Sequence, residues 1–507
     1  MKKTATLFII VAILVLILLP VLSACDKADG SGGGTDRLVI YNWEDYIDTD
    51  MCDDFAAYYK EVTGRSLSIT YTTFDTNETM LTKVLKGDAN VDLICPSEYA
   101  IEKLLRAGCI LNHSDVLADI AQQAQSLGIT FDGMSSLGNG DGNVEPAIMD
   151  VIRSMFGAGE LKDDSGNVLN DASGKALDMT EYMVPYFWGT LGILYNTSVI
   201  TSDELDEYGW GVLWNVQQNQ KLENKILMKD SVRDSYAAAV FYMYEYGLLP
   251  EGYEDYSVQS LINCTDDAML ETAKKVLTEQ RDHISGYEVD FGKDDMINEI
   301  VYADLAWSGD AMYAIEEGGY DEENGYQLDY YVPSVASNIW YDGWVIPTTV
   351  NNKLAAMMFI DYMCDPMNGI RNSMEVGYTS AVAKEILSSD EDVCDYIIEC
   401  YSYDEYGNPI LFDDDGNQTD YDVNEFFGDK RRYPTINATL GVMRDFGAQN
   451  DALVQMWQQA KSGSGVPSSL WWCLLAIILA VGAAIGVYFL VQALKRRPRK
   501  ISANTAK

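Results

Sequence analysis

Short strand-type segments alternate with helical ones after residue 35, and this alternation constrains the fold more than any other feature of the chain. The expected strands are Arg37–Trp43, Leu67–Tyr71 and Val91–Cys95, and the expected helices are Asp50–Val62, Asn77–Leu85 and Ala100–Ala107. Such alternation predicts an α/β fold with a largely parallel, doubly wound sheet. Ligands of these sheets bind beyond the carboxyl ends of the strands, where Trp43 and Pro96-Ser97 lie.

Residues 1–24 have the composition of a secretion signal, with Lys2 and Lys3 before an apolar run. The run ends in Leu22-Ser23-Ala24-Cys25. This ending resembles the bacterial lipobox, whose cysteine is lipidated and becomes the mature N-terminus, so Cys25 is a candidate lipidation site. Cleavage of an ordinary signal after Ala24 is the alternative. Residues 25–36 include a Gly-Ser run and are expected to form a flexible tether.

A second apolar segment, residues 470–494, is long enough to cross a bilayer as a helix. Trp471 and Trp472 lie at its first border, and the basic residues 495–507 follow its second. Bases beyond a membrane helix predict a cytoplasmic C-terminus. The part before the helix is therefore expected outside the membrane, periplasmic or at the cell surface, held by the lipid, the helix or both. Residues 463–469 are the expected flexible linker.

The charge of the chain excludes several kinds of function. Asp and Glu number 78 against 35 Lys and Arg, which gives a formal net charge of −43. Such a surface repels phosphate backbones and attracts cations, so nucleic acid is a poor candidate partner. The two histidines and the lack of HExxH, GxSxG and CxxC motifs argue against a histidine-rich metal site and a serine hydrolase. Cys394 and Cys400 are close enough in sequence to suggest a local disulfide, which sequence alone does not decide.

Two stretches interrupt the strand–helix pattern, at about residues 133–178 and 401–430. Both contain repeated Asp-Gly-Asn turn signals and are expected to form surface insertions or small hairpins. An EF-hand around Gly416 fails the motif, because Leu411 would take the first ligand position. No metal site is predicted here, and the sequence assigns these stretches no function.

Tryptophan and tyrosine lie beside acids at the ends of expected strands. The clusters are Trp43-Glu44-Asp45-Tyr46, Ser97-Glu98-Tyr99, Trp307-Ser308-Gly309-Asp310 and Trp340-Tyr341-Asp342. A ligand that carries ammonium groups on an apolar chain needs aromatic faces for its methylenes and carboxylates for its charges. Because the pairing recurs in loops, it indicates a binding site for such a cation.

These segments, in this order, resemble the spermidine/putrescine-binding proteins of ABC transporters, which are bacterial extracellular solute-binding proteins. The resemblance covers about residues 37–461 outside the two insertions. It rests on eight segments: 41–46, 74–80, 91–99, 184–189, 230–234, 305–309, 340–347 and 377–379. The resemblance implies a binding protein and not an enzyme, with no cofactor, and a transporter permease with a separate ATPase as its partner.

The resemblance also implies a role for each matching residue. The aromatic cage around the methylenes is expected from Trp43, Tyr46, Tyr99, Trp307, Trp340 and Tyr378. The carboxylates are expected from Asp45, Asp234 and Asp342, with Asp342 facing an amine in the middle of the site. Ser97 is expected to offer its hydroxyl, and Gln458 to contact a terminal amine.

One position departs from the spermidine-type pattern. Ser231 stands where that pattern has a second acid beside Asp230, so Asp230 or Glu44 is expected to compensate. The choice between spermidine and putrescine stays open for this reason. Arg233 is expected to orient Asp230 and Asp234 by charged hydrogen bonds.

The family fold implies two α/β lobes of the periplasmic-binding-protein type II with a hinge between them. Lobe 1 is expected to contain residues 36–188 and 343–381, and lobe 2 residues 189–342 and 382–462. Ligand in the cleft would favour closure, because it would contact both lobes. The alternatives are a binder of another cation such as a quaternary ammonium compound, an extracellular acidic hydrolase, and a surface module that has lost transport.

Overall fold

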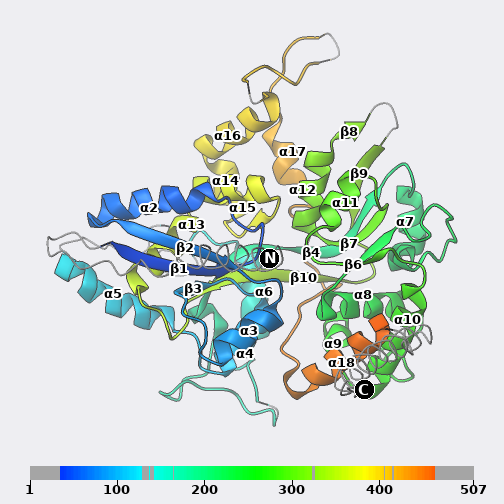
Figure 1. Ribbon diagram of the computed structural model, residues 1–507, viewed down its shortest axis with the longest axis horizontal. Helices are drawn as coiled ribbons and strands as arrows, with labels where there is room; N and C mark the ends of the chain where they lie inside the picture. Colours follow the sequence, from blue (N-terminus) through cyan, green and yellow to red (C-terminus); the bar gives the residue numbers. More distant parts are fainter. Residues whose placement is uncertain are drawn as a thin grey trace, which may run out of the picture.

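The computed structural model describes residues 35–127, 136, 142–163, 165–321, 326–404, 406–413 and 416–462. Two groups of strands and helices lie side by side and are joined by two long strands that pass between them (Figure 1). These strands are β4 (Met183–Asn196) and β10 (Ser337–Val345), and every residue of both is buried. The two-lobed α/β architecture expected from the sequence is therefore present.

The first group is built on parallel strands in the order β2-β1-β3. β1 (Asp36–Asn42) pairs with β2 (Leu67–Thr73) and with β3 (Leu93–Ile94). Its helices are α2 (Asp50–Thr63), α3 (Asn77–Leu85), α4 (Glu98–Arg106), α5 (His113–Leu127), α6 (Pro146–Phe156) and α13 (Lys353–Met363). The strands and helices predicted for the start of the chain are confirmed, with β3 shorter than expected.

Local sequence signals explain where these elements begin and end. α2 buries Met51, Phe55 and Tyr59, which are spaced four residues apart and so share one helix face. It ends at Gly64, whose φ of 70° is the left-handed conformation that glycine adopts without steric cost. α3 begins after Thr76, whose side chain accepts a hydrogen bond from the backbone of Thr79.

The second group also has a parallel set, β6-β5-β7. The strands are β5 (Ile226–Lys229), β6 (Gly286–Glu288) and β7 (Ala303–Trp307), with β8 (Tyr320–Asp321) and β9 (Tyr326–Tyr331) as a hairpin. Its helices are α7 (Ser202–Tyr208), α8 (Val232–Glu245), α9 (Val258–Ile262), α10 (Asp267–Arg281), α11 (Gly292–Ile297), α12 (Ser308–Gly318) and α18 (Asn450–Ser462).

The centre of the molecule is antiparallel. β4 pairs with β10 along its first half and with β7 and β9 along its second half. The expectation of a largely parallel sheet is therefore wrong in the centre, because two strands that pass between the groups run against their neighbours. The β4–β10 register shifts between Asp342 and Gly343, so a bulge lies at the middle of this junction.

The remaining elements cover the junction and its ends. They are α14 (Pro366–Val376), α15 (Lys384–Ser389), α16 (Glu391–Ser402), α17 (Val423–Gly428), β11 (Thr379–Ser380), β12 (Leu440–Gly441) and the 3-10 helices η2 (Met179–Glu181), η3 (Gly209–Trp214) and η4 (Gly447–Gln449). Cys394 and Cys400 are free thiols in α16. Six helical positions separate them by about 9 Å along the axis, too far for the suggested disulfide.

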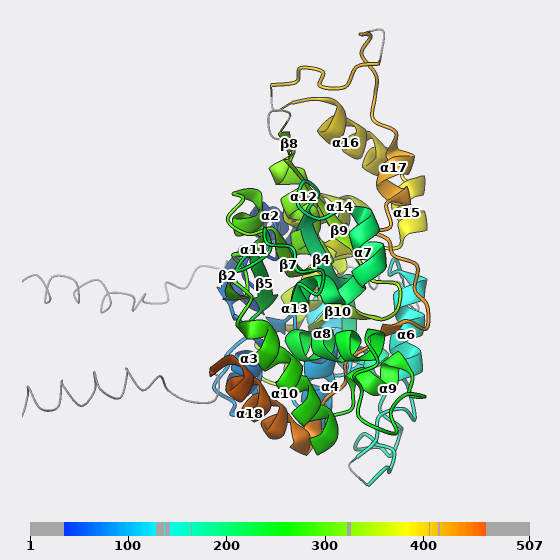
Figure 2. The same cartoon turned by 90° about the vertical axis from the view of Figure 1, so that its right-hand side faces the viewer.

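The described parts of both insertions contain small hairpins, as predicted, but the first range also contains α6, whose Ile148, Ile152 and Phe156 are in the core, so the prediction of a surface insertion is wrong for that helix. Single β-bridges join Lys162 to Val168 and Asn170 to Ala176 in the first, and Tyr403 to Pro409 and Phe412 to Gln418 in the second. Figure 2 shows the described parts of these hairpins projecting from opposite ends of the molecule.

Most of the predictions for the two ends of the chain concern residues outside the described ranges. No helix within the described ranges is both long and apolar enough to cross a membrane. The signal segment 1–24, Cys25, the linker 463–469, the expected membrane helix 470–494 and the basic tail lie outside the described residues, as does nearly all of the tether.

Candidate functional site

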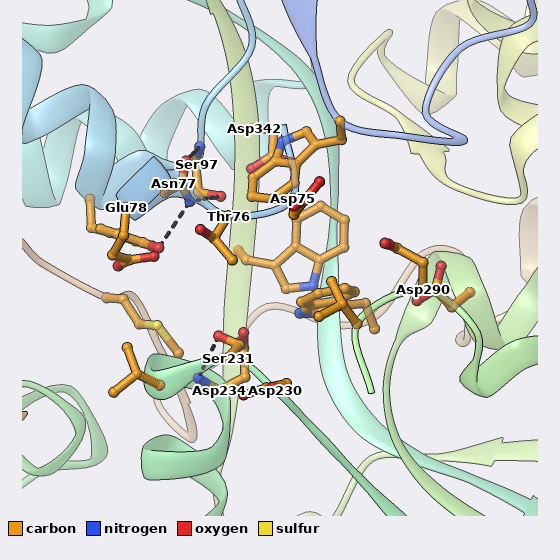
Figure 3. Close-up of a pocket in the computed structure, with 18 of the residues that line it drawn as sticks. Asp75, Thr76, Asn77, Glu78, Ser97, Asp230, Ser231, Asp234, Asp290 and Asp342 are labelled. Carbon is orange, nitrogen blue, oxygen red and sulfur yellow. Dashed lines mark hydrogen bonds between the residues drawn. The ribbon is translucent and has the colours of Figure 1, made fainter. Parts of the chain in front are cut away.

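One cavity of about 310 Å³ is lined by residues of both strand groups and of the strands that join them (Figure 3). Every residue that the sequence predicted to bind ligand lines this cavity. They are Trp43, Asp45, Tyr46, Ser97, Tyr99, Asp230, Asp234, Trp307, Trp340, Asp342, Tyr378 and Gln458. Side chains distributed over more than 400 positions of the sequence thus meet at one place, while their contact with a ligand stays a prediction.

The first group contributes two loops at the carboxyl ends of β1 and β3. Trp43, Asp45 and Tyr46 follow β1, and Asp45 has a positive φ of 47° that turns the chain back toward the cavity. Ser97 and Tyr99 begin α4 directly after β3. The amide of Asn77 at the start of α3 donates to both, at 3.0 Å to Ser97 Oγ and 2.9 Å to the Tyr99 hydroxyl.

The second group contributes the starts of two helices. Ser231 caps α8 by accepting from the Asp234 backbone N–H, which places Asp230 and Asp234 on either side of the helix start. Trp307 ends β7 and precedes α12, whose first turn carries Asp310. The acids of this group are therefore held by helix N-termini, where backbone dipoles favour negative charge.

Trp340 and Asp342 come from β10, two residues apart and so on the same face of the strand. The Tyr378 ring packs 5.7 Å from the Trp340 ring and 4.7 Å from the Tyr46 ring. Its hydroxyl donates to Asp310 at 2.7 Å. These contacts tie the aromatic residues of both groups to the central strands.

Asp342 is a buried carboxylate with no Lys or Arg nitrogen within ion-pair distance among the described residues. Burial raises its pKa to about 7, and the charge of Asp234 adds to this, while the Ser97 and Tyr46 hydroxyls lower the pKa. Its Oδ1 atom has no hydrogen-bond partner in the part of the chain that is described. An unpaired buried acid is costly, and a ligand cation would offset that cost.

The cavity as a whole is strongly acidic. Its described lining contains ten carboxylic acids and two lysines. Burial raises the pKa of Asp234, and burial together with Asp342 raises the pKa of Glu98 well above its usual value. A site with this charge excess concentrates cations and repels anions.

The last described helix, α18, closes one side of the cavity. Trp457 and Gln458 line it, and Lys461 forms an ion pair with Asp230 at 2.5 Å. The Trp457 ring also packs against the Tyr287 ring, with centroids 5.1 Å apart. The predicted Gln458 therefore reaches the cavity although it lies 80 residues beyond Tyr378 in the chain.

Several lining residues were not predicted as ligand contacts, among them Asp75, Glu78, Asp290, Lys293, Asp310 and Trp457. Asp310 follows Trp307 in one of the aromatic–acid clusters, and Asp75 and Glu78 lie in segment 74–80, so for these acids a signal was available in the sequence. Lys293 and Asp290 lie around α11, outside every cluster and segment noted above, so nothing in the sequence marked them.

The expectation for Arg233 is wrong. Its guanidinium donates to the Arg444 carbonyl at 2.8 Å and to Asn450 at 3.4 Å, and lies 3.8 Å from Glu78. It also covers the Tyr99 ring. Because α8 turns this side chain away from Asp230 and Asp234, the arginine packs the wall of the cavity and does not orient those acids.

The model of one protein family matches residues 51–393, and its members are bacterial extracellular solute-binding proteins. The chain belongs to this family. Members bind solutes and are not enzymes, in agreement with the prediction of an extracytoplasmic binding protein. Within the described residues of this solute-binding protein, no group of three or more His, Cys, Asp or Glu side chains is arranged to hold a metal ion.

Individual relatives of the solute-binding protein are distant. The spermidine/putrescine-binding periplasmic protein of Salmonella typhimurium is 24% identical over 358 residues, which are 70% of this chain and 81% of the relative. The putrescine-binding periplasmic protein SpuD of Pseudomonas aeruginosa is 23% identical over 334 residues, 65% of this chain and 74% of the relative.

Two solved structures have a similar fold. The spermidine/putrescine ABC transporter substrate-binding protein PotD of Streptococcus pneumoniae aligns with a TM-score of 0.52 at 25% identity, over 84% of this chain and 99% of that one. The TpPotD lipoprotein of Treponema pallidum aligns with a TM-score of 0.53 at 17% identity, over 84% of this chain and 100% of that one.

Proposed function

We propose that this solute-binding protein captures a polyamine outside the membrane and delivers it to an ABC importer. The observation that carries the proposal is Asp342, a buried acid without a cation partner in the described structure, at the wall of a cavity lined by tryptophan and tyrosine. A polyamine offers ammonium groups to such acids and methylenes to the rings. Relatives named for spermidine and putrescine support the same ligand class.

Binding would stabilise the closed arrangement of two lobes, for which we propose residues 36–188 with 343–381 and 189–342 with 382–462. Asp45 and Ser97 stand on one side of the cavity and Asp230 and Asp234 on the other. A ligand that contacts both sides favours the closed form by its differential contacts. Closure also removes water, which strengthens each ammonium–carboxylate pair.

A quaternary ammonium ligand would use the same aromatic residues but needs fewer acids. Ten carboxylic acids in the described lining favour a ligand with more than one positive charge. Quaternary nitrogen also cannot donate hydrogen bonds, so Asp342 Oδ1 would stay without a donor. The acid count therefore supports a polyamine over choline-type compounds.

The proposed importer places the chain beside its permease. Lipidation of Cys25, a membrane helix at residues 470–494 and a cytoplasmic tail at 495–507 would each hold it there and raise its effective concentration at the permease. Recovery of a permease and an ATPase after cross-linking in cells and affinity purification of the full chain tests the partnership. Recovery of the chain without any transporter subunit would contradict it.

Calorimetric titration of the full-length chain tests the ligand class, with putrescine, spermidine, choline and a neutral oligosaccharide. We expect putrescine or spermidine to bind with a Kd of about 1 µM or tighter, which corresponds to about 8 kcal/mol. Choline is expected to bind at least about tenfold more weakly, a difference of about 1.4 kcal/mol. Tight binding of choline with no response to either polyamine would overturn the proposal.

A further inference from the structure

The acids of the cavity are of two kinds, which the sequence does not distinguish. Asp45 is paired with Lys293 at 3.4 Å, and Asp230 with Lys461 at 2.5 Å. Asp234 and Asp342, in contrast, have no lysine or arginine within ion-pair distance in the described parts of the chain. Two of the four carboxylates predicted for the ligand are thus already neutralised by the protein.

A third lysine, Lys229, lies behind Trp307, one of the aromatic residues that line the cavity. The Lys229 ammonium is buried 4.3 Å from the centre of the Trp307 ring and 3.1 Å from Asp310, and it pairs with Glu288 at 2.5 Å. Burial lowers the pKa of Lys229, but Glu288 and Asp310 outweigh that effect and raise it, so the group is charged. The Lys229 ammonium group therefore contacts an indole ring and a carboxylate, the same two kinds of group that a ligand ammonium group would contact.

Two lysines lie at one end of the cavity, where carboxylates surround and outnumber them. Lys293 lines the cavity near Asp290, and the ammonium groups of Lys229 and Lys293 both lower the pKa of Asp290 against the effect of burial. Figure 3 shows Asp290 on a different side of the cavity from both Asp342 and Asp234. An additional ammonium group at the Asp290 end would compete with these two fixed cations for the same carboxylates.

We propose that Lys229 and Lys293 make this a diamine site, in which Asp342 and Asp234 receive the two ammonium groups of a short ligand such as putrescine. The inference rests on the proposed polyamine function and specifies which polyamine the site prefers. A triamine has to share the carboxylates of Lys293 and Lys229 with its third charge or displace Lys293 from Asp45. Both alternatives weaken spermidine relative to putrescine, because like charges repel and a displaced pair must be rehydrated.

Titration calorimetry on the full-length chain tests this with putrescine, spermidine and the variant Lys293→Met. The wild type is expected to bind putrescine at least about tenfold more tightly than spermidine, which is about 1.4 kcal/mol. Lys293→Met should improve spermidine more than putrescine, reducing the ratio of the two Kd values by about fivefold, or about 1 kcal/mol. Lys461→Met, which frees Asp230, is a second variant at a different cavity acid.

Lys353→Met is the matched control, since it removes the same charge from a lysine–aspartate pair with Asp119, and neither residue lines the cavity. It should leave the ratio unchanged. Equal or tighter binding of spermidine by the wild type overturns the diamine preference, as does an unchanged ratio in both cavity variants. Failure of the wild type to bind either ligand is a different result, because it overturns the polyamine function itself.

Discussion

The guanidinium carbon of Arg233 lies 3.6 Å from the centre of the Tyr99 ring, so a helix of the second strand group covers a cavity residue of the first. The same guanidinium lies 4.2 Å from the Phe446 ring and donates to the Arg444 carbonyl. It is almost completely buried. Arg233 therefore links the two groups by stacking on Tyr99, while its hydrogen bonds to Arg444 and Asn450 hold it within the second group.

Arg233→Met is expected to lower the free energy of unfolding by about 2 kcal/mol, because a buried charged hydrogen bond is lost. Chemical denaturation followed by tryptophan fluorescence measures this. Arg371→Met is the control, since its ion pair with Asp54 is more exposed and should cost less than about 1 kcal/mol. Equal effects of the two variants would show that the stacked contact between the groups contributes nothing.

Asp342→Asn is expected to weaken polyamine binding by roughly 2 to 5 kcal/mol, since it removes one partner of a buried charge pair. The amide has the same shape, and Asp342 has no ion pair with another described residue to lose, so the variant should fold. Titration calorimetry gives the affinity. Asp92→Asn, at a buried acid beside β3 that does not line the cavity, should leave the affinity unchanged. Unchanged affinity in Asp342→Asn would remove this acid from the site.

The sequence was sufficient to predict the residues of the cavity wall that belong to recurring segments. Trp43 and Ser97 could be placed because they follow strands whose carboxyl ends share one sheet edge. Tyr378 and Gln458 could be placed only through the resemblance to a family. The helices α2 and α3 were predicted closely because capping and glycine signals mark their ends.

The sequence was not sufficient for features that depend on contacts between distant segments. The antiparallel pairing of β4 with β10 joins residues about 150 positions apart, and neither strand carries a local signal for direction. The lysine–aspartate ion pairs of the cavity also join distant segments, since Lys293 and Asp45 are 248 positions apart. A charge run in a sequence gives no indication of which acids the protein neutralises itself.

Polyamine affinity is expected to rise with pH from about 5 to 8, because Asp342 in the ligand-free protein has a pKa of about 7 and must ionise to pair with an ammonium group. Alkyl ammonium groups, with pKa values of about 10, stay charged over this range. The affinity should change by up to about tenfold per pH unit below pH 7. Calorimetry at several pH values, in buffers of different ionisation enthalpy, measures both the slope and the release of protons.

The same group gives the ligand-free protein an opposite dependence. The folded-state pKa of Asp342 lies above the unfolded value of about 3.9, so the folded state binds more protons between the two. The free energy of unfolding should therefore fall as pH rises from about 4 to 7, by up to about 4 kcal/mol from this acid. Asp342→Asn should remove this contribution from both profiles. Identical pH profiles in the variant and the wild type would contradict the assignment.

Gly309→Ala is expected to reduce polyamine affinity by at least about tenfold, or about 1.4 kcal/mol. A methyl group at Gly309 would lie 2.1 Å from Tyr378 Cδ1, so the Tyr378 ring must move away from Trp340 and Asp310. Gly318→Ala is the matched control in the same helix, where the nearest atom is at 3.5 Å. The control should keep full affinity and gain up to about 1 kcal/mol of stability, since alanine favours a helix over glycine. Full affinity in Gly309→Ala would mean that the position of the Tyr378 ring does not matter for binding.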